Sequence, residues 1–250
     1  MRNVLYSLLM LLALAGQGTA TTNATTSVSG LPYAPDSRVV NLADRNLTVF
    51  PEAVTQLSRL EILVLDRNAI TELPDSLIRM QQLRQISMSG MELSVLPAPV
   101  TAIAGLEELN LNKNHLTTLP DTIGKLANLN ILHIAQNNLT TLPETIGQLT
   151  RLEILNLGGN RLAVIPGTIG SLTMLKSLSL EQNLLKVIPT EICQLAALER
   201  LDLSGNQLTA LPAAINTLAH LKVLRISNNP IPVQEEDRIR AALPQCMIVR

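Results

Sequence analysis

The chain reads LEELNLNKNHLTTLP from Leu106 to Pro120 and LNILHIAQNNLTTLP from Leu129 to Pro143. Both segments carry leucine or isoleucine, an asparagine and a proline at matching places, 23 residues apart. A fixed period of this size is typical of proteins built from stacked structural repeats. The same spacing continues on both sides of these segments, so it decides how nearly the whole chain is organised.

Nine copies of the repeat follow one another along the chain. They begin at residues 37, 60, 83, 106, 129, 152, 175, 198 and 221. Their common pattern, L-x-x-L-x-L-x-x-N-x-L-x-x-L-P-x-x-I-G-x-L, resembles the leucine-rich repeat, in the 23-residue form that many bacterial repeat proteins and the Ras-associated intracellular group share. The resemblance implies a scaffold that binds other molecules, and it specifies no ligand.

Each repeat predicts one short strand and one short helical turn. In the stretch 109–111, alternation directs one set of side chains into the core and the other toward solvent. After each proline, residues such as Ile123 and Leu126 lie on one side of a helical turn. The sequence therefore predicts an α/β fold, a leucine-rich repeat solenoid. We expect a curved right-handed horseshoe with a parallel β-sheet on the concave face and short helical turns on the convex face.

One polar position recurs among the core leucines, where the strand turns out of the sheet. An asparagine amide there can satisfy backbone groups that are buried between neighbouring coils. Arg45 and Met91 replace the asparagine in the first and third repeats, and we expect a locally weak or kinked coil at 86–100. The predicted asparagine ladder consists of Asn68, Asn114, Asn137, Asn160, Asn183, Asn206 and Asn229.

The N-terminal end departs from the repeat. A charged start at Arg2, an apolar run over 4–15 and small residues at Gly18 and Ala20 are typical of a secretory signal peptide. We predict that residues 1–20 are this peptide and that it is cleaved after Ala20. The apolar run is shorter than the roughly 20 residues that cross a bilayer, so we expect no stable membrane insertion of the mature chain. The predicted location is secreted, periplasmic or at the cell surface.

Three further segments complete the predicted organisation. Residues 21–36 are rich in threonine and serine and predict a flexible leader. Residues 37–229 hold the repeat strands and turns, and residues 230–250 predict a C-terminal cap of one helix and one strand. Acidic residues such as Glu235 suit the beginning of that helix, and Pro244 ends it.

The composition argues against several functions. The chain has a net charge of −1, one Phe, two Tyr and no Trp, so it lacks the basic field and the stacking rings that nucleic-acid binding uses. No nucleophile with a base, pair of catalytic carboxylates or phosphate-binding loop is evident, so we predict no enzyme and no cofactor. The histidines share no ligand spacing with Cys193 and Cys246, which predicts no metal site and two separate, half-buried thiols.

The solvent side of the concave sheet remains as the candidate site. Two isoleucines on adjacent strands are expected to be exposed and to be bordered by polar side chains, as in a protein-binding patch. β-branched residues also favour strands for reasons unrelated to binding, and this alternative stays open. The predicted partner-binding residues are Glu108, Asn110, Ile131, His133, Ile154 and Asn156, with Asp202 and Arg225 as a second, charged patch.

The interpretation is an exported scaffold that recognises a macromolecular partner, which we expect to be a protein, through its concave β-face. One alternative is a surface adhesin or glycan-binding protein, because the small polar side chains of the concave face leave a glycan ligand possible. A structural, self-associating envelope protein is another. An intracellular signalling scaffold of the Ras-associated type is the remaining alternative, and it requires the apolar N-terminus to stay uncleaved.

Overall fold

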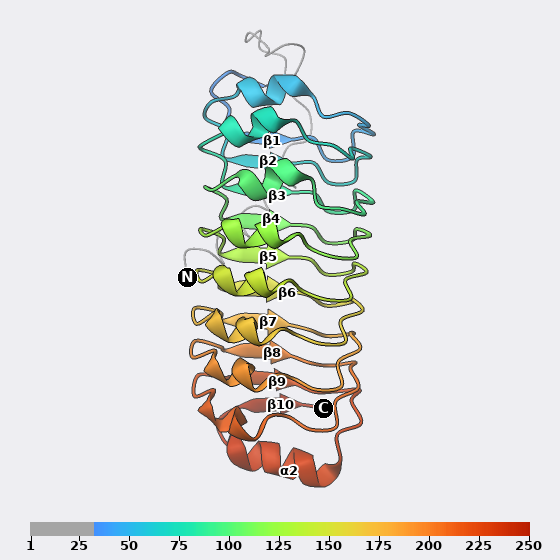
Figure 1. The fold of residues 1–250 in the computed structure, drawn as a ribbon, viewed down its shortest axis with the longest axis vertical. Coiled ribbons are helices and arrows are strands. Elements are labelled where there is room, and N and C mark those ends of the chain that lie inside the picture. Colours follow the sequence, from blue (N-terminus) through green and yellow to red (C-terminus); the bar gives the residue numbers. More distant parts are fainter. Residues whose placement is uncertain (1–32) are drawn as a thin grey trace.

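Each repeat forms one strand at the same place in its coil, as Figure 1 shows for the computed structural model, which describes residues 33–250. All ten strands are parallel, pair in the order β1 to β10 and stay in a common register. The predicted signal peptide and most of the leader lie outside the described residues. The strands are β1 Val39–Asn41, β2 Ile62–Val64, β3 Gln85–Ser87, β4 Glu108–Asn110, β5 Ile131–His133, β6 Ile154–Asn156, β7 Ser177–Ser179, β8 Arg200–Asp202, β9 Val223–Arg225 and β10 Met247–Val249.

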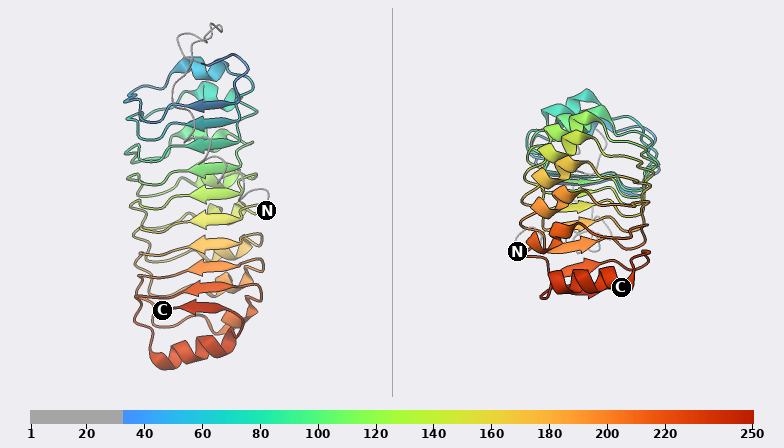
Figure 2. Two further views of the ribbon diagram at one scale, coloured as in Figure 1. Left: turned by 180° about the vertical axis from the view of Figure 1, so that it is seen from behind. Right: turned by 60° about the horizontal axis from the view of Figure 1, so that its bottom comes forward.

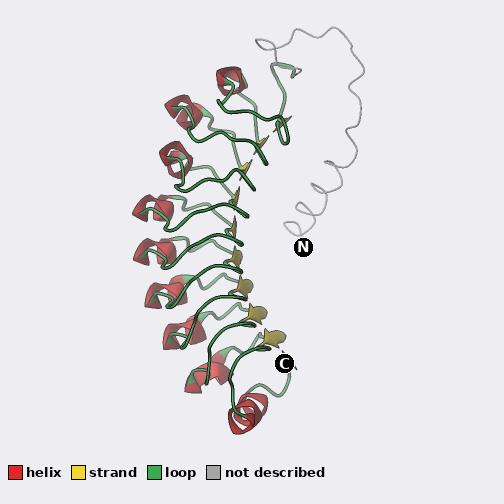
Figure 3. Ribbon diagram, turned by 90° about the vertical axis from the view of Figure 1, so that its right-hand side faces the viewer, coloured by secondary structure: helices red, strands yellow, loops and turns green. Residues whose placement is uncertain are grey.

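A short 3-10 helix follows each proline of the repeat. In the fourth coil the N–H of Ile123 donates to the carbonyl of Pro120, at 2.9 Å, and the other coils repeat this turn. These helices line the outside of a gentle arc and the strands line the inside, which confirms the predicted fold class (Figure 3). The helices are η1 Glu52–Gln56, η2 Asp75–Arg79, η3 Ala98–Ala102, η4 Asp121–Lys125, η5 Glu144–Gln148, η6 Gly167–Ser171, η7 Thr190–Gln194 and η8 Ala213–Thr217.

The core is one continuous stack of leucine and isoleucine, crossed by the asparagine ladder. The Asn137 amide donates to the carbonyl of Leu111 in the preceding coil, at 2.9 Å, and to Ile134 in its own coil, at 3.2 Å. Its oxygen accepts from the N–H of Leu116, at 3.0 Å. The other asparagines of the predicted ladder repeat these contacts. Each amide therefore joins two coils and satisfies backbone groups that water does not reach.

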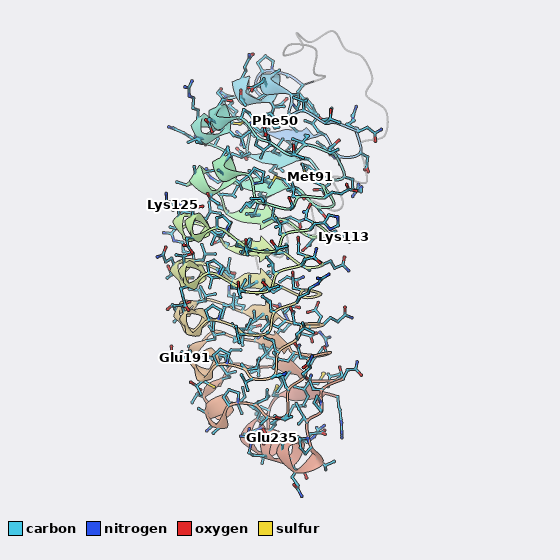
Figure 4. The ribbon with its side chains drawn as sticks, turned by 45° about the vertical axis from the view of Figure 1, so that its right-hand side comes forward. Phe50, Met91, Lys113, Lys125, Glu191 and Glu235 are labelled. Carbon is cyan, nitrogen blue, oxygen red and sulfur yellow. The ribbon has the colours of Figure 1, made fainter. Side chains whose placement is uncertain are left out.

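The ladder is interrupted at Met91, whose side chain packs in the core instead (Figure 4). Within residues 33–250, no acceptor contacts the N–H of Ile70, the group that an asparagine at this position would satisfy. Strand β3 nevertheless pairs in register with β2 and β4, so the expected kink is not seen in the sheet. A flexible methionine side chain fills the space and keeps the coils aligned.

At each end of the described stack, a segment outside the regular repeats packs against the end coils. At the first coil, the Tyr33 hydroxyl donates to the carbonyl of Asn41 and accepts from its N–H, although the sequence places Tyr33 in the leader. At the other end, the helix α2, Val233–Ala242, precedes β10 and packs on the last coils. The Glu235 carboxylate accepts from the N–H of Leu211, at 3.0 Å, and this contact ties the helix to η8's coil (Figure 4).

The two cysteines lie apart, as the sequence predicts. Cys193 lies in η7 and Cys246 precedes β10, and both are half-buried free thiols. Burial is the main cause that raises the pKa of both thiols. Both side chains are therefore protonated near neutral pH.

Met91→Asn is expected to increase the free energy of unfolding by about 1 kcal/mol. The new side-chain amide would form three hydrogen bonds of about 1 kcal/mol each, and one of them would satisfy the backbone N–H of Ile70 and so remove the cost of leaving that group unpaired. Together these gains would exceed the burial energy of about 1.5–3 kcal/mol that is lost with the methionine side chain. Urea denaturation of the two proteins measures the difference. The reverse change in a regular coil, Asn137→Met, is the control and should lower stability by several kcal/mol. An unchanged or lower stability for Met91→Asn would contradict this account of the ladder.

Candidate binding face

The concave face is built from the outer residues of each three-residue strand. The middle residue of a strand points into the core, as Leu109, Leu132 and Leu155 do, and its two neighbours face solvent. Because the strands are parallel and in register, residues 23 apart stand side by side across the sheet. The left view of Figure 2 looks onto this face.

The structure places the six residues of the predicted central patch in two rows across three strands. Glu108, Ile131 and Ile154 form one row, on β4, β5 and β6. The second row, also in register, contains Asn110, His133 and Asn156. The side chains that the sequence groups together are thus neighbours in the folded chain.

Ile131 corrects one expectation, because its side chain is buried, with 4% of its surface exposed. Parallel strands lie about 4.8 Å apart, so Glu108 and Ile154 stand close on either side of it. Ile154 is half-buried. The apolar centre of the patch is therefore smaller than the sequence predicts, because Ile131 presents almost none of its side chain to solvent.

Burial shifts the ionisation of the two titratable groups in this patch. It raises the pKa of the Glu108 carboxyl, whose Oε2 accepts from Gln85 Nε2 at 3.1 Å. Burial also lowers the pKa of His133, which favours the neutral imidazole. Among residues 33–250, nothing hydrogen-bonds to the buried Nδ1 of His133. A partner atom would therefore meet a neutral ring and a carboxyl that is only partly hydrated.

The asparagines of the patch hold the backbone as well as facing solvent. Asn110 Oδ1 accepts from the N–H of Asn112, at 3.1 Å, and Asn156 Oδ1 accepts from that of Gly158, also at 3.1 Å. Asn110 Nδ2 donates to Ser87 Oγ, at 3.1 Å. Because these contacts already orient both side chains, little side-chain entropy remains to be lost when a partner binds.

The second predicted patch lies further along the stack. Arg225 Nη1 and Asp202 Oδ2 are 3.5 Å apart on adjacent strands, and Asp202 also accepts from the N–H of Ser204. The arginine side chain is more than half exposed, so this pair contributes little to stability. It is separated from the central patch by β7, which carries two serines on this face.

The predicted partner-binding residues leave out Glu181, which lies just after β7 on the same face. A Cβ added at Gly158 would overlap the Glu181 carboxylate, so the carboxylate lies across that glycine. In the described part of the chain, its Oε2 atom is buried and has no hydrogen-bond partner. Burial is also the largest cause that raises its pKa. The signal was the glycine itself, which stands in register with Glu181 one repeat earlier.

Two general features of the described residues bear on function. Residues 33–250 contain no group of three or more His, Cys, Asp or Glu side chains arranged to hold a metal ion. No helix in the same part of the chain has the length and apolar character needed to cross a membrane.

Comparison with known sequences identifies the repeat. The leucine-rich repeat region family matches residues 99–183, and the leucine rich repeat family matches residues 163–208 and 173–231. The chain is a leucine-rich repeat protein. None of the curated proteins matches this leucine-rich repeat chain in sequence.

Many solved leucine-rich repeat structures resemble the chain. The ectodomain of the plant membrane receptor kinase GASSHO1/SCHENGEN3 from Arabidopsis thaliana, in complex with CASPARIAN STRIP INTEGRITY FACTOR 2, is 31% identical over 72% of this chain and 26% of that one, with a TM-score of 0.58. An internalin (inlF) from Listeria monocytogenes is 21% identical over 84% and 57%, with a TM-score of 0.68. The functional domain of InlJ from the same organism is 21% identical over 84% and 42%, with a TM-score of 0.69. The chain thus spans about a quarter to three fifths of these proteins, and the internalin likeness shows the fold alone.

Glu108→Gln is expected to stabilise the protein at pH 7 and to have less effect at pH 4. Because burial raises the pKa of Glu108, the folded state holds the proton to higher pH than the unfolded chain does. Stability is therefore lost as pH rises from the unfolded pKa through the folded pKa, and the neutral amide avoids this loss. Urea denaturation at both pH values measures it, with the exposed Glu144→Gln as control. An equal effect of Glu108→Gln at both pH values would contradict the assignment.

Proposed function

We propose that this leucine-rich repeat protein is an exported scaffold that binds a protein partner through the concave face of its sheet. The observation that carries the proposal is the pair of registered rows on β4, β5 and β6, which present polar groups on a rigid surface. A preformed surface of this kind loses little entropy on binding. The interacting side chains in this proposal are Glu108, Asn110, His133, Ile154 and Asn156, with the buried Ile131 between Glu108 and Ile154 and with Asp202 and Arg225 as the second contact.

Two unpaired polar atoms support the choice of this face. His133 Nδ1 and Glu181 Oε2 are both buried without a hydrogen-bond partner within residues 33–250. Leaving a buried polar group unsatisfied costs about 1–3 kcal/mol. A partner that supplies these hydrogen bonds recovers that cost, so the two atoms support binding at the concave face.

A protein is favoured over a glycan as the partner. The Arabidopsis ectodomain, which resembles 72% of this chain, is seen in complex with CASPARIAN STRIP INTEGRITY FACTOR 2. The outward strand positions of β1 to β9 include no Trp, Tyr or Phe, and sugar rings commonly stack on such side chains. The small, half-buried residues instead suit an extended segment that makes many modest contacts.

The concave face is tested by adding two arginines to it and two elsewhere. His133→Arg with Asn156→Arg places cations on adjacent strands of the face, and Ala196→Arg with Ala219→Arg places the same charges on adjacent coils outside it. Proteins captured by the full chain from extracts and surface material of the source organism are identified, purified and titrated against each variant. We expect about a tenfold or larger loss of affinity for the concave variant alone, because charge insertion blocks close contact.

The two variants must melt at similar temperatures for this comparison to hold. Equal affinity of both variants for a verified partner would contradict the concave site. Failure of the full chain to capture any protein, together with binding to glycans, would contradict the protein partner.

Export is a separate part of the proposal and rests on the N-terminal sequence. When the full chain is produced in a secreting host, we expect Thr21 as the first residue of the mature protein, since small residues at Gly18 and Ala20 suit the cleavage enzyme. Intact mass and N-terminal sequencing measure it. A protein retained in the cytoplasm with Met1 or Arg2 at its start would instead favour the intracellular scaffold.

A further inference from the structure

One flank of the solenoid carries features that binding on the concave face does not use. We define the exit flank as the outward residues at the tenth, twelfth and thirteenth positions of each of the first eight repeats, where the chain leaves the strand and runs toward the convex turn. In the fourth repeat these are His115, Thr117 and Thr118. Nearly all of these residues are exposed. The exit flank forms the right-hand edge in Figure 1 and faces the viewer in Figure 3.

Exposed apolar side chains are concentrated on the exit flank. Ten large apolar side chains are exposed in the described residues, and half of them lie here. They are Val49, Val95, Val164, Leu184 and Val187, with 75%, 70%, 55%, 46% and 65% of their surface exposed. Apolar groups gathered on one surface in this way are typical of an interaction site.

The charges of the exit flank are separated by sign along the stack. Glu72 and Glu92 lie in the second and third repeats, and Arg161 and Lys186 lie in the sixth and seventh. None of the four belongs to an ion pair within residues 33–250. All four side chains are exposed and remain available to a partner.

The opposite flank, where the chain enters each strand, shows a different arrangement. Several of its charged residues, at the second position of the repeat, pair with the opposite charge on the adjacent coil. The pairs are Arg38 with Glu61, Arg84 with Glu107, Lys176 with Glu153, and Lys222 with Glu199. Charges on that flank are therefore satisfied between adjacent coils, whereas those of the exit flank are left for a surface outside the chain.

A second copy of the chain, turned end for end, complements the exit flank. The rotation axis runs from the concave to the convex side between the fourth and fifth repeats, so it preserves the curvature of the arc. It places the third repeat of one copy against the sixth of the other, and Glu92 then faces Arg161 while Val95 faces Val164. Thr118 faces Thr141 at the centre.

The same rotation also matches the outer coils. The second repeat faces the seventh, so Glu72 lies opposite Val187, next to Lys186, and the exposed Ala69 lies opposite Leu184. Every one of these contacts occurs twice because the axis is two-fold. A parallel arrangement would place like charges together, so the sign separation selects the antiparallel one.

We propose that the exit flank is the interface of an antiparallel homodimer. Eight coils at a spacing of about 4.8 Å extend the contact over about 34 Å, in a strip only a few residues wide. Such an area lies at the lower end for specific interfaces, so the dimer is reversible and forms at higher protein concentration. The axis leaves both concave faces open on the same side of the dimer, so this inference does not depend on the proposed concave-face binding.

The test is a charge exchange measured by sedimentation velocity of the full chain over a concentration series. Arg161→Glu sets a carboxylate against Glu92 twice in each dimer, and Glu92→Arg sets a second guanidinium against Arg161 twice. Each variant alone should raise the dissociation constant of the dimer by about tenfold or more. An equal mixture of the two variants should recover association, because each mixed dimer contains two opposite-charge pairs.

Arg79→Glu on the convex helix η2 is the matched control and should leave association unchanged. Circular dichroism and melting temperatures show whether all variants remain folded. A parent chain that stays monomeric throughout the concentration series would overturn the proposal. So would a dimer that both single variants form as well as the parent does, or a mixture that fails to recover.

Discussion

The backbone groups buried between two coils can be satisfied only by those coils, and the asparagine amide is the group that satisfies them. The carbonyl of Leu111 accepts both from Asn114 in its own coil and from Asn137 in the next. An unpaired buried amide or carbonyl costs more than the pair contributes, so each coil must keep its height and angle relative to its neighbours. This constraint supports the parallel register, the continuous leucine core and the smooth arc along most of the stack, and at Met91 the pairing of β3 with β2 and β4 keeps the register.

On a surface built in this way, equivalent residues of successive coils stand side by side in rows. The lateral neighbours of a side chain are the residues 23 before and 23 after it, as for Ile131 between Glu108 and Ile154. Surface chemistry can therefore change from coil to coil while the backbone stays the same. This separation explains how one repeat supports a half-buried polar face on its strands and an exposed apolar and charged flank beside them.

The concave face and the exit flank are separate surfaces of the same coils. The concave face holds partly desolvated groups such as His133, with few charges near the centre, which suits a partner that supplies hydrogen bonds. The exit flank holds hydrated charges of both signs around exposed valines, which suits a partner surface whose charges follow the opposite order along the stack. Association through the flank would present two concave faces together, and two linked sites bind a repeated or extended partner more tightly than one.

The sequence by itself determined the fold class, the strands, the helical turns and the asparagine ladder, because a 23-residue period brings the same residue types to the same place in every coil. It also determined which side chains stand next to each other on the concave face. Only the tertiary structure decided how much of each side chain remains exposed. Ile131 is buried between Glu108 and Ile154, and Glu181 lies across Gly158 because glycine leaves space there. Only the structure shows that the backbone N–H of Ile70 has no acceptor within residues 33–250. Exposure and pairing depend on atoms from adjacent coils, which a linear sequence pattern does not contain.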